Sequence, residues 1–355
     1  MGQESISLHE NPYAFARVSV MKSKLLKKDD YDKLMKMKTN EFIKFLEETE
    51  YKKEVDELAI HHKGMELLEL AVNKNLTRTY EKLKRITEEG LKELIQLYLK
   101  RNDLWNIKTV LRAIFVKEKI EFLEDVLIPV GSLKKDLLVE LAKQGTVREA
   151  LELLAKSKTY KPHAAEILAL PTENLMEAEG WLTSQYYNDV LEIAEALPEE
   201  GRLFRGFLIN EIVILNLVTL FKLKKEGLSA KEIEKYLINV ESEAANLKKK
   251  VVELLLNASD METLFQVLEK TRFSEAAEEG FAEYKENSSL IVFETALYKK
   301  LLQDSMLLLH QHPLSIDVIL GYMFAKSIEG KNLKMIMKGK ELGIKDEIIE
   351  KEIVI

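Results

Sequence analysis

Apolar residues recur at every third or fourth position along most of the chain, as in Leu91, Leu94, Ile95, Leu97 and Tyr98. This spacing puts them on one face of a helix with 3.6 residues per turn, so it predicts amphipathic helices. Alternating runs of Val, Ile and Thr, which would predict strands, are nearly absent. Because only 14 Gly and 6 Pro interrupt 355 residues, we expect an all-α fold of about sixteen to eighteen helices.

Three short motifs predict where helices begin. In each, a hydroxyl residue is followed three positions later by Glu, as in Thr146–Glu149, Ser229–Glu232 and Ser259–Glu262. The hydroxyl oxygen can accept one free backbone N–H at the start of a helix, and the carboxylate can accept another. The sequence therefore predicts a capping box at each of these positions.

The most membrane-like stretch, residues 207–221, reads FLINEIVILNLVTLF. It is interrupted by Asn210, Glu211 and Asn216, and it is shorter than the roughly 20 apolar residues that a spanning helix needs. We therefore expect a buried helix here and no direct membrane span. The first residues also lack the basic start and apolar core of a secretory signal.

Three features recur in the same order along the chain. The first is a short amphipathic helix followed by a hydroxyl residue and then an aromatic residue, at Thr49 and Tyr51, Ser157 and Tyr160, and Thr271 and Phe273. The second is a glutamate near the start of a longer helix, at Glu69, Glu179 and Glu294. The third is an asparagine with a basic residue six positions later, at Asn106 and Arg112, Asn216 and Lys222, and Asn332 and Lys338.

The spacing of these features predicts a triplicated chain. The three asparagines are 110 and 116 residues apart, which is longer than the solenoid period of 20–50 residues and close to the size of a small domain. We expect helical units at 1–128, 129–240 and 241–355, related by approximate threefold symmetry because the middle copy is the most divergent. A single irregular helical domain with accidental periodicity remains the alternative.

The repeat-defining residues have simple structural interpretations. Tyr51 and Phe273 are expected to be core aromatics. The three glutamates are expected to be charges favoured by a helix N-terminus, and the three asparagines to be buried amides that satisfy a bend or a helix contact.

Composition narrows the function. Charged residues make up 32% of the chain, the net charge is −7 and the pI is about 5.7. Nucleic-acid binders usually carry a basic footprint, so the balance argues against a nucleic-acid partner. The absence of Cys from the sequence excludes disulfides, thiolate metal sites and cysteine nucleophiles.

The sequence lacks the material for familiar catalytic motifs. It contains neither a phosphate-binding loop of the G-x-x-x-x-G-K-[ST] type, nor G-x-G-x-x-G, nor H-E-x-x-H. Six histidines occur, and the pair His310 and His312 before Pro313 is better explained by a solvated turn than by a metal site. We therefore predict no catalytic residue, no cofactor and no metal.

Basic residues gather in three places that could dock an acidic or polar partner. The candidates are Arg17, Lys22, Lys24 and Lys28 near the N-terminus, Lys248 and Lys249 in the last third, and Lys334 and Lys338 near the C-terminus. Solvated helix faces are the alternative interpretation. If they do dock a partner, charge reversal at Lys22, Lys24 and Lys28 together weakens binding and leaves the fold intact.

Several segments resemble one known family. Residues 13–26 read YAFARVSVMKSKLL, an opening typical of the C subunit of archaeal and bacterial A/V-type ATPases, which is the counterpart of the eukaryotic d subunit. The family's Leu-x-x-Thr-x-Tyr element matches Leu46 to Tyr51, and its Asn-Ile…Leu-Arg element matches Asn106 to Arg112. Residues 329–340 resemble its C-terminal stretch, although Lys334 stands where an Arg is usual.

The resemblance spans the whole chain, and it implies a structural function that depends on the shape of the protein and not on an active site. It implies a funnel-shaped, non-catalytic rotor subunit of three helical lobes, without an active site or nucleotide pocket. Such a subunit links central-stalk subunits of the D and F type to the membrane proteolipid ring on its cytoplasmic face. A helical adaptor or scaffold of an unrelated assembly and an all-helical enzyme are the alternatives from other classes.

Overall fold

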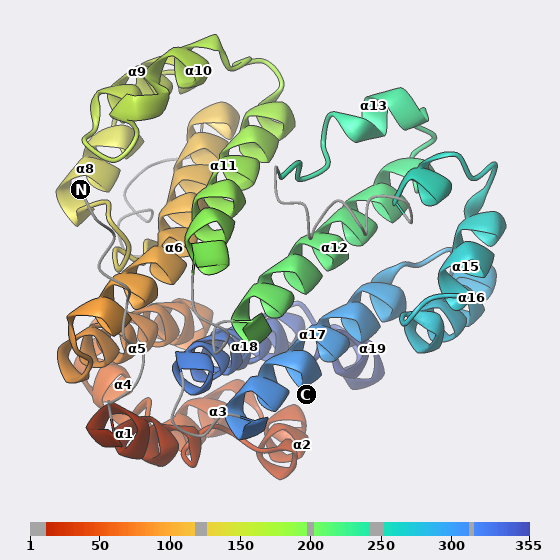
Figure 1. Cartoon of the computed structure of the whole chain (residues 1–355). Coiled ribbons are helices and arrows are strands. Elements are labelled where there is room, and N and C mark those ends of the chain that lie inside the picture. The colour runs from red at the N-terminus through yellow and green to blue at the C-terminus, as the bar shows by residue number, and fades with distance from the viewer. Residues whose placement is uncertain (1–11, 118–125, 197–201, 241–251, 312–315) are drawn as a thin grey trace.

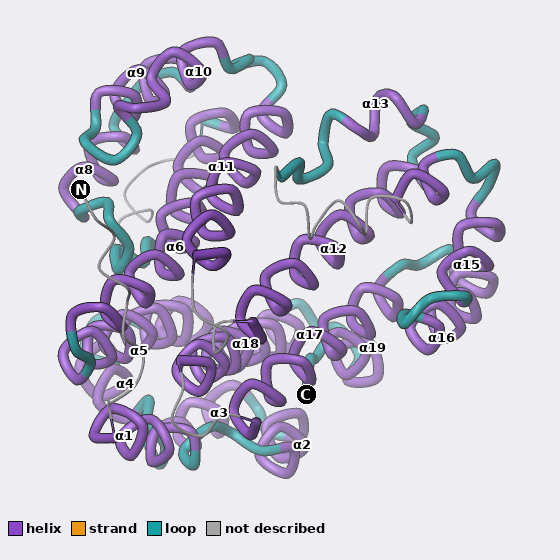
Figure 2. Tube along the Cα trace, in the orientation of Figure 1, coloured by secondary structure: helices purple, strands orange, loops and turns teal. Residues whose placement is uncertain are grey.

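The computed structural model describes residues 12–117, 126–196, 202–240, 252–311 and 316–355. Within these ranges the chain folds into 17 α-helices and one 3₁₀ helix, and Figure 2 shows only helices and loops. The predicted all-α fold is therefore confirmed.

Six long helices form the frame of the molecule. They are α5 (Gly64–Ile86), α6 (Glu89–Val116), α11 (Leu175–Ala196), α12 (Arg202–Lys225), α17 (Ile291–Gln311) and α18 (Ile316–Glu341). Shorter helices lead into and out of them: α1 (Pro12–Lys22), α2 (Lys28–Lys36), α3 (Thr39–Leu46), α4 (Lys52–Leu58), α8 (Lys135–Ala142), α9 (Val147–Lys156), η2 (Lys161–His163), α10 (Ala164–Ala169), α13 (Ala230–Glu234), α15 (Met261–Glu269), α16 (Ser274–Asn287) and α19 (Asp346–Glu352).

The long helices touch one another in a closed cycle. In chain order α5 contacts α6, α6 contacts α11, α11 contacts α12, α12 contacts α17 and α17 contacts α18, and α18 returns to contact α5. The last contact joins the two ends of the chain. In Figure 1 the red helices α1–α4 accordingly lie at the same end of the molecule as the blue helices α17–α19.

The helix starts follow the capping chemistry in two of three places. Thr146 caps α9 and Ser229 caps α13, each within a complete capping box. The prediction at Ser259 was wrong, because Asp260 caps α15 by accepting the backbone N–H of Thr263 at 2.8 Å. The hydroxyl of Ser259 instead donates to the Asp260 carboxylate at 2.7 Å, which as a charged acceptor holds it more strongly.

The three repeat-defining asparagines make the same pair of hydrogen bonds. Each amide nitrogen donates to the carbonyl of the residue 22 positions later, and each amide oxygen accepts the N–H of that residue. The donor–acceptor distances are 2.8 and 2.9 Å for Asn106 with Ile128, 3.0 and 2.7 Å for Asn216 with Ile238, and 2.6 and 3.1 Å for Asn332 with Val354. All three asparagines are buried, as expected. Each therefore ties the segment after a long helix back onto that helix.

The hydroxyl residues of the first feature also share one role. Thr49 and Thr271 each donate a side-chain hydrogen bond to the carbonyl three residues earlier, and each accepts the N–H of the aromatic two residues later. Ser157 accepts the N–H of Tyr160 at 3.4 Å, three residues later because this copy has one extra residue. The aromatics Tyr51 and Phe273 are buried, which confirms that they are core residues.

Helix α12 contains the membrane-like stretch. Its segment from Phe204 to Lys225 has a mean hydropathy of 1.7 and is 67% buried inside the protein. Among the described helices it alone is long and apolar enough to cross a membrane. Its apolar residues pack against other helices instead, with the ring of Phe221 edge-to-face with Phe265 and tilted against Phe293, so the prediction of a buried helix is confirmed.

Candidate functional site

The cycle of long helices surrounds a cavity of about 830 Å³, which we call the central cavity. Helices α5, α6, α11, α12 and α18 all contribute to its wall. The apolar lining comes mainly from Met65, Leu76, Trp105, Met176, Leu215 and Met335. Charged side chains stand among these residues, namely Glu69, Arg101, Lys108, Glu179, Lys331, Lys334 and Lys338. This mixture of apolar surface and separated charges is typical of protein–protein interfaces.

Two of the repeat features meet where neighbouring helix pairs join. The guanidinium of Arg112 on α6 binds both carboxylate oxygens of Glu179 on α11, at 2.6 and 2.5 Å. At the next junction the ammonium of Lys222 lies 2.8 Å from the carboxylate of Glu294. These glutamates were expected to be charges favoured by a helix N-terminus. Instead, Glu179 and Glu294 each form an ion pair with the basic residue that stands six positions after the asparagine of the preceding copy. The sequence prediction missed this pairing, although the fixed order of the two features is the signal that could have revealed it.

The third junction, between α18 and α5, is arranged differently. Its equivalent residues are Lys338 and Glu69, which both line the central cavity. Within the described part of the chain neither makes an ion pair. The junction is held by Lys334, whose ammonium donates to the side-chain oxygen of Asn73 at 2.5 Å. Burial lowers the pKa of Lys334. The junction that joins the two ends of the chain therefore leaves one lysine and one glutamate turned to the cavity.

A partly buried ion pair joins α6 and α12 at the wall of the cavity. The guanidinium of Arg101 lies 2.6 Å from the carboxylate of Glu211, and it also stacks over the ring of Tyr98 at 4.7 Å. These two charged residues stand five positions before Asn106 and Asn216, and Ser327 stands five positions before Asn332. The three equivalent positions therefore carry a cation, an anion and a neutral residue.

Lys108 on α6 is a second cation of the cavity wall. Its ammonium donates to the hydroxyl of Thr183 at 2.6 Å, and that hydroxyl donates to the carbonyl of Glu179. Burial lowers the pKa of Lys108 to about 8, although the Glu179 carboxylate opposes the shift. Its charge is thus held in the cavity wall at a cost in solvation.

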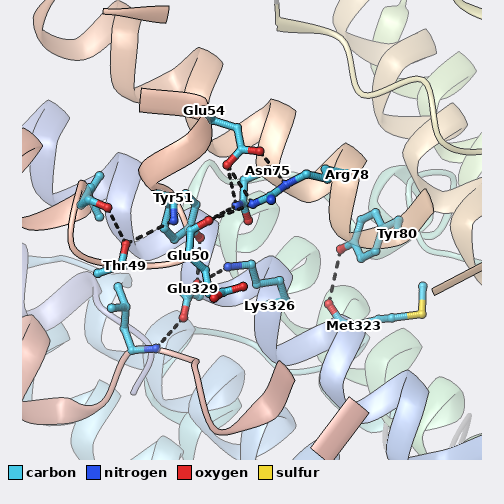
Figure 3. Close-up of polar contacts among 12 residues, drawn as sticks. Thr49, Glu50, Tyr51, Glu54, Asn75, Arg78, Tyr80, Met323, Lys326 and Glu329 are labelled. Carbon is cyan, nitrogen blue, oxygen red and sulfur yellow. Dashed lines mark hydrogen bonds and ion pairs between the residues drawn. The ribbon is translucent and has the colours of Figure 1, made fainter. Parts of the chain in front are cut away.

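A second polar network fastens the N-terminal segment to α18 (Figure 3). The carboxylate of Glu329 accepts hydrogen bonds from the Tyr51 hydroxyl at 2.8 Å, the Leu26 N–H at 2.6 Å and the Lys326 ammonium at 2.6 Å. Lys326 also lies 4.1 Å from the centre of the Tyr51 ring. Burial and the neighbouring Glu329 carboxylate raise the pKa of Tyr51. In the sequence Glu329 and Tyr51 belong to separate motifs, and only the fold brings them together.

The candidate docking lysines lie in different environments. Arg17, Lys24, Lys28 and Lys338 are exposed, while Lys22 and Lys334 are half-buried. Lys24 forms an ion pair with Glu50 at 2.6 Å, and burial lowers the pKa of Lys22. Lys248 and Lys249 lie outside the described residues. The structure thus places Lys334 and Lys338 on the central cavity and the N-terminal group on α1, the turn after it and the start of α2.

The described residues hold no cluster of three or more His, Asp or Glu side chains that could bind a metal ion. They present an all-helical protein in which six long helices contact one another in a cycle and five of them line a cavity of mixed apolar and charged side chains.

Comparison with known proteins identifies this architecture. Residues 14–352 match the model of the ATP synthase (C/AC39) subunit family, and the chain belongs to that family. It is 36% identical over 345 residues to the C subunit of the A-type ATP synthase of Methanosarcina mazei, covering 97% of this chain and 92% of the relative. It is also 32% identical over 347 residues to the protein of the same name from Archaeoglobus fulgidus, covering 97% and 96% of the two chains.

Membership of this family decides whether the chain is an enzyme and whether the alternative functions apply. The family is a structural, non-catalytic part of an ATP synthase, so the chain is not an enzyme in its own right. The alternatives of an adaptor for an unrelated assembly and of an all-helical enzyme are excluded on the same ground.

Proposed function

We propose that the chain is the rotor subunit that links the central stalk of an A/V-type ATP synthase to its membrane proteolipid ring. It transmits torque during proton or sodium transport and lies on the cytoplasmic face of the membrane, held there by the ring. Its units are residues 1–128, 129–240 and 241–355, arranged with approximate threefold symmetry as a funnel. The recurring asparagine bonds and the cycle of helix contacts support this division.

The observation that carries the proposal is the central cavity. Five long helices from all three proposed units line it, so a partner seated there touches every unit at once. A close-packed helical ring is stiff, and torque passes through it with little loss to deformation. The apolar side chains offer contact area, while Arg101, Lys108 and Lys338 offer charges that fix orientation. We assign this cavity to the tip of the central-stalk subunits of the D and F type.

A binding experiment tests the stalk assignment. Trp105 and Met335 line the cavity, so Trp105→Glu and Met335→Glu place a carboxylate on the proposed contact surface. Buried aromatic anchors dominate many interfaces, so each variant is expected to weaken binding of a purified D–F stalk pair by at least about tenfold. Ile60, which is 77% exposed and outside the cavity, provides the control Ile60→Glu. Equal affinity of all four proteins would show that the stalk does not enter the cavity.

The ring face is tested separately. Charge reversal of Lys22, Lys24 and Lys28 together is expected to reduce co-sedimentation with proteolipid rings or binding of the stalk pair. The cavity variants are expected to keep ring binding, because their substitutions lie on another surface. Unchanged binding of both partners by the triple variant would rule out the N-terminal lysines as a docking surface. Circular dichroism checks that each variant stays folded.

A further inference from the structure

A second cavity, of about 180 Å³, lies between α1, α5, α18 and the turn before α4. It shares no lining residue with the central cavity. The charged side chains that line it are five cations and one carboxylate, namely Lys24, Arg78, Lys82, Arg85, Lys326 and Glu50. Lys24 and Arg85 are exposed, whereas Arg78 and Lys82 are half-buried and Lys326 is buried. Positive charges gathered around so small a volume repel one another unless carboxylates or a ligand balance them.

Carboxylates balance three of the five cations. Lys24 lies 2.6 Å from Glu50, Arg78 lies 2.6 Å from Glu54, and Lys326 lies 2.6 Å from Glu329. These ion pairs fix part of the wall, and Figure 3 shows two of them, Arg78 with Glu54 and Lys326 with Glu329, near Tyr51. Lys82 and Arg85 remain, and within the described part of the chain neither has an ion-pair or hydrogen-bond partner. The cavity therefore carries two uncompensated positive charges.

The position of these two cations follows from the helix. Arg78, Lys82 and Arg85 are spaced four and three residues apart on α5, so they share one helix face. Burial lowers the pKa of Lys82, and the neighbouring charges of Arg17, Lys24 and Arg78 lower it further, against the opposing effect of Glu50. An anion in the cavity would relieve this repulsion.

Two largely buried residues also contribute hydroxyl groups to the lining of the cavity. Thr79 is 8% exposed and Tyr322 is 3% exposed, and neither hydroxyl has a hydrogen-bond partner among the described residues. Neither oxygen is among the fully enclosed polar atoms without a partner, so both remain accessible from the cavity and are available to a ligand. The cavity thus combines two free cations with two free hydroxyl donors.

We propose that this cavity binds a phosphate group in its doubly charged form. Two negative charges match the two uncompensated cations, and the phosphate oxygens can accept from the hydroxyls of Thr79 and Tyr322. Pockets for drug-sized ligands span roughly 300–1,000 Å³, so the cavity suits a single phosphate group and not a whole nucleotide. Inorganic phosphate and the headgroup of an anionic phospholipid share this chemistry.

Calorimetric titration of the purified full-length chain with inorganic phosphate tests the proposal. Lys82→Gln and Arg85→Gln are each expected to weaken phosphate binding at least about tenfold, since each removes a charged donor. Tyr322→Phe removes only a hydroxyl and is expected to weaken it a few fold. Lys231→Gln, at an exposed site on α13, is the control and is expected to bind as the unmodified chain does. Melting temperatures verify the fold, and Lys82→Gln is expected to keep that of the unmodified chain.

A second arm distinguishes the two sources of phosphate. Flotation with phosphatidylcholine vesicles, with and without phosphatidic acid, measures binding to a lipid headgroup. Phosphatidic acid-dependent flotation that is lost in Lys82→Gln and Arg85→Gln, without binding of inorganic phosphate, assigns the cavity to a lipid. Absence of binding in both arms, or binding that is equal in all variants, overturns the proposal. Neither outcome bears on stalk docking at the central cavity, because the two cavities share no lining residue and these variants leave Lys24 of the N-terminal docking group unchanged.

Discussion

The three asparagine bond pairs allow a prediction that compares equivalent sites in one molecule. Asn332 is 2% exposed and binds both the N–H and the carbonyl of Val354, which is 3% exposed. Asn332→Ala leaves both backbone groups buried without a partner. An unsatisfied buried group costs about 1–3 kcal/mol, and partial access of water to the chain end reduces the sum, so we expect a loss of about 2–4 kcal/mol.

Hydrogen exchange of the backbone amides is the suitable assay, because a protein of several packed units opens locally before it unfolds globally. A loss of about 2 kcal/mol corresponds to roughly thirtyfold faster exchange of the Val354 amide. Asn106→Ala and Asn216→Ala are expected to accelerate the amides of Ile128 and Ile238 by comparable factors, since their bonds have similar lengths. Each variant should leave the other two amides protected.

Asn257 supplies the control. It is exposed, and its amide donates only to the carbonyl of Glu253 one helical turn earlier. Asn257→Ala is expected to leave all three protected amides unchanged. The prediction is refuted if the Val354 amide of Asn332→Ala exchanges within about twofold of the unmodified rate. In that case the asparagine bonds do not hold residue 354 against α18, and the three bond pairs do not have the same stabilising role.

Three further predictions concern the buried charges and the helix packing. Lys326 and Glu329 are both 3% exposed, so Glu329→Gln strands a buried ammonium and is expected to cost about 3–5 kcal/mol in urea denaturation, whereas adding Lys326→Met recovers part of the loss. A Cβ at Gly280 would lie 2.5 Å from the Cβ of Phe293, so Gly280→Ala is expected to cost about 1–3 kcal/mol, seen as a lower Tm; an unchanged Tm would contradict the close approach of α16 and α17. Burial lowers the pKa of Lys108 from 10.5 to about 8, so the unfolded chain binds more protons between these values and stability rises with pH across that window relative to Lys108→Met. A stability difference between the two proteins that does not change with pH would refute this assignment.

Much of the fold could be predicted from the sequence, because a helix is specified by interactions between residues close together in the chain. The apolar period, the capping residues at Thr146 and Ser229, and the scarcity of Gly and Pro specify helices through contacts within a few residues. The failure at Ser259 is also local, since a neighbouring carboxylate competes for the same N–H. The order of the three repeat features was equally visible, because the copies recur at nearly constant spacing along the chain.

The candidate site was readable only in part. Lys334 and Lys338 were singled out as basic residues, and the fold places them on the central cavity. No local pattern indicated that Arg112 would bind Glu179, because the partners stand 67 residues apart and only helix packing brings them together. Nothing in the sequence singled out Trp105 or Met176, since the apolar residues that line a cavity and those that fill a core follow the same helical period.

By itself, then, the sequence determined the helices, their order and the threefold recurrence of asparagine, glutamate and basic residues. Only the tertiary structure decided that α18 returns to α5, that Glu329 fastens the start of the chain near its end, and that two cavities with different linings result. The physical reason is the range of the interactions. Hydrogen bonds within a helix are set by residues three or four apart, whereas closing the cycle depends on contacts between residues about 300 positions apart, such as Leu26 and Glu329.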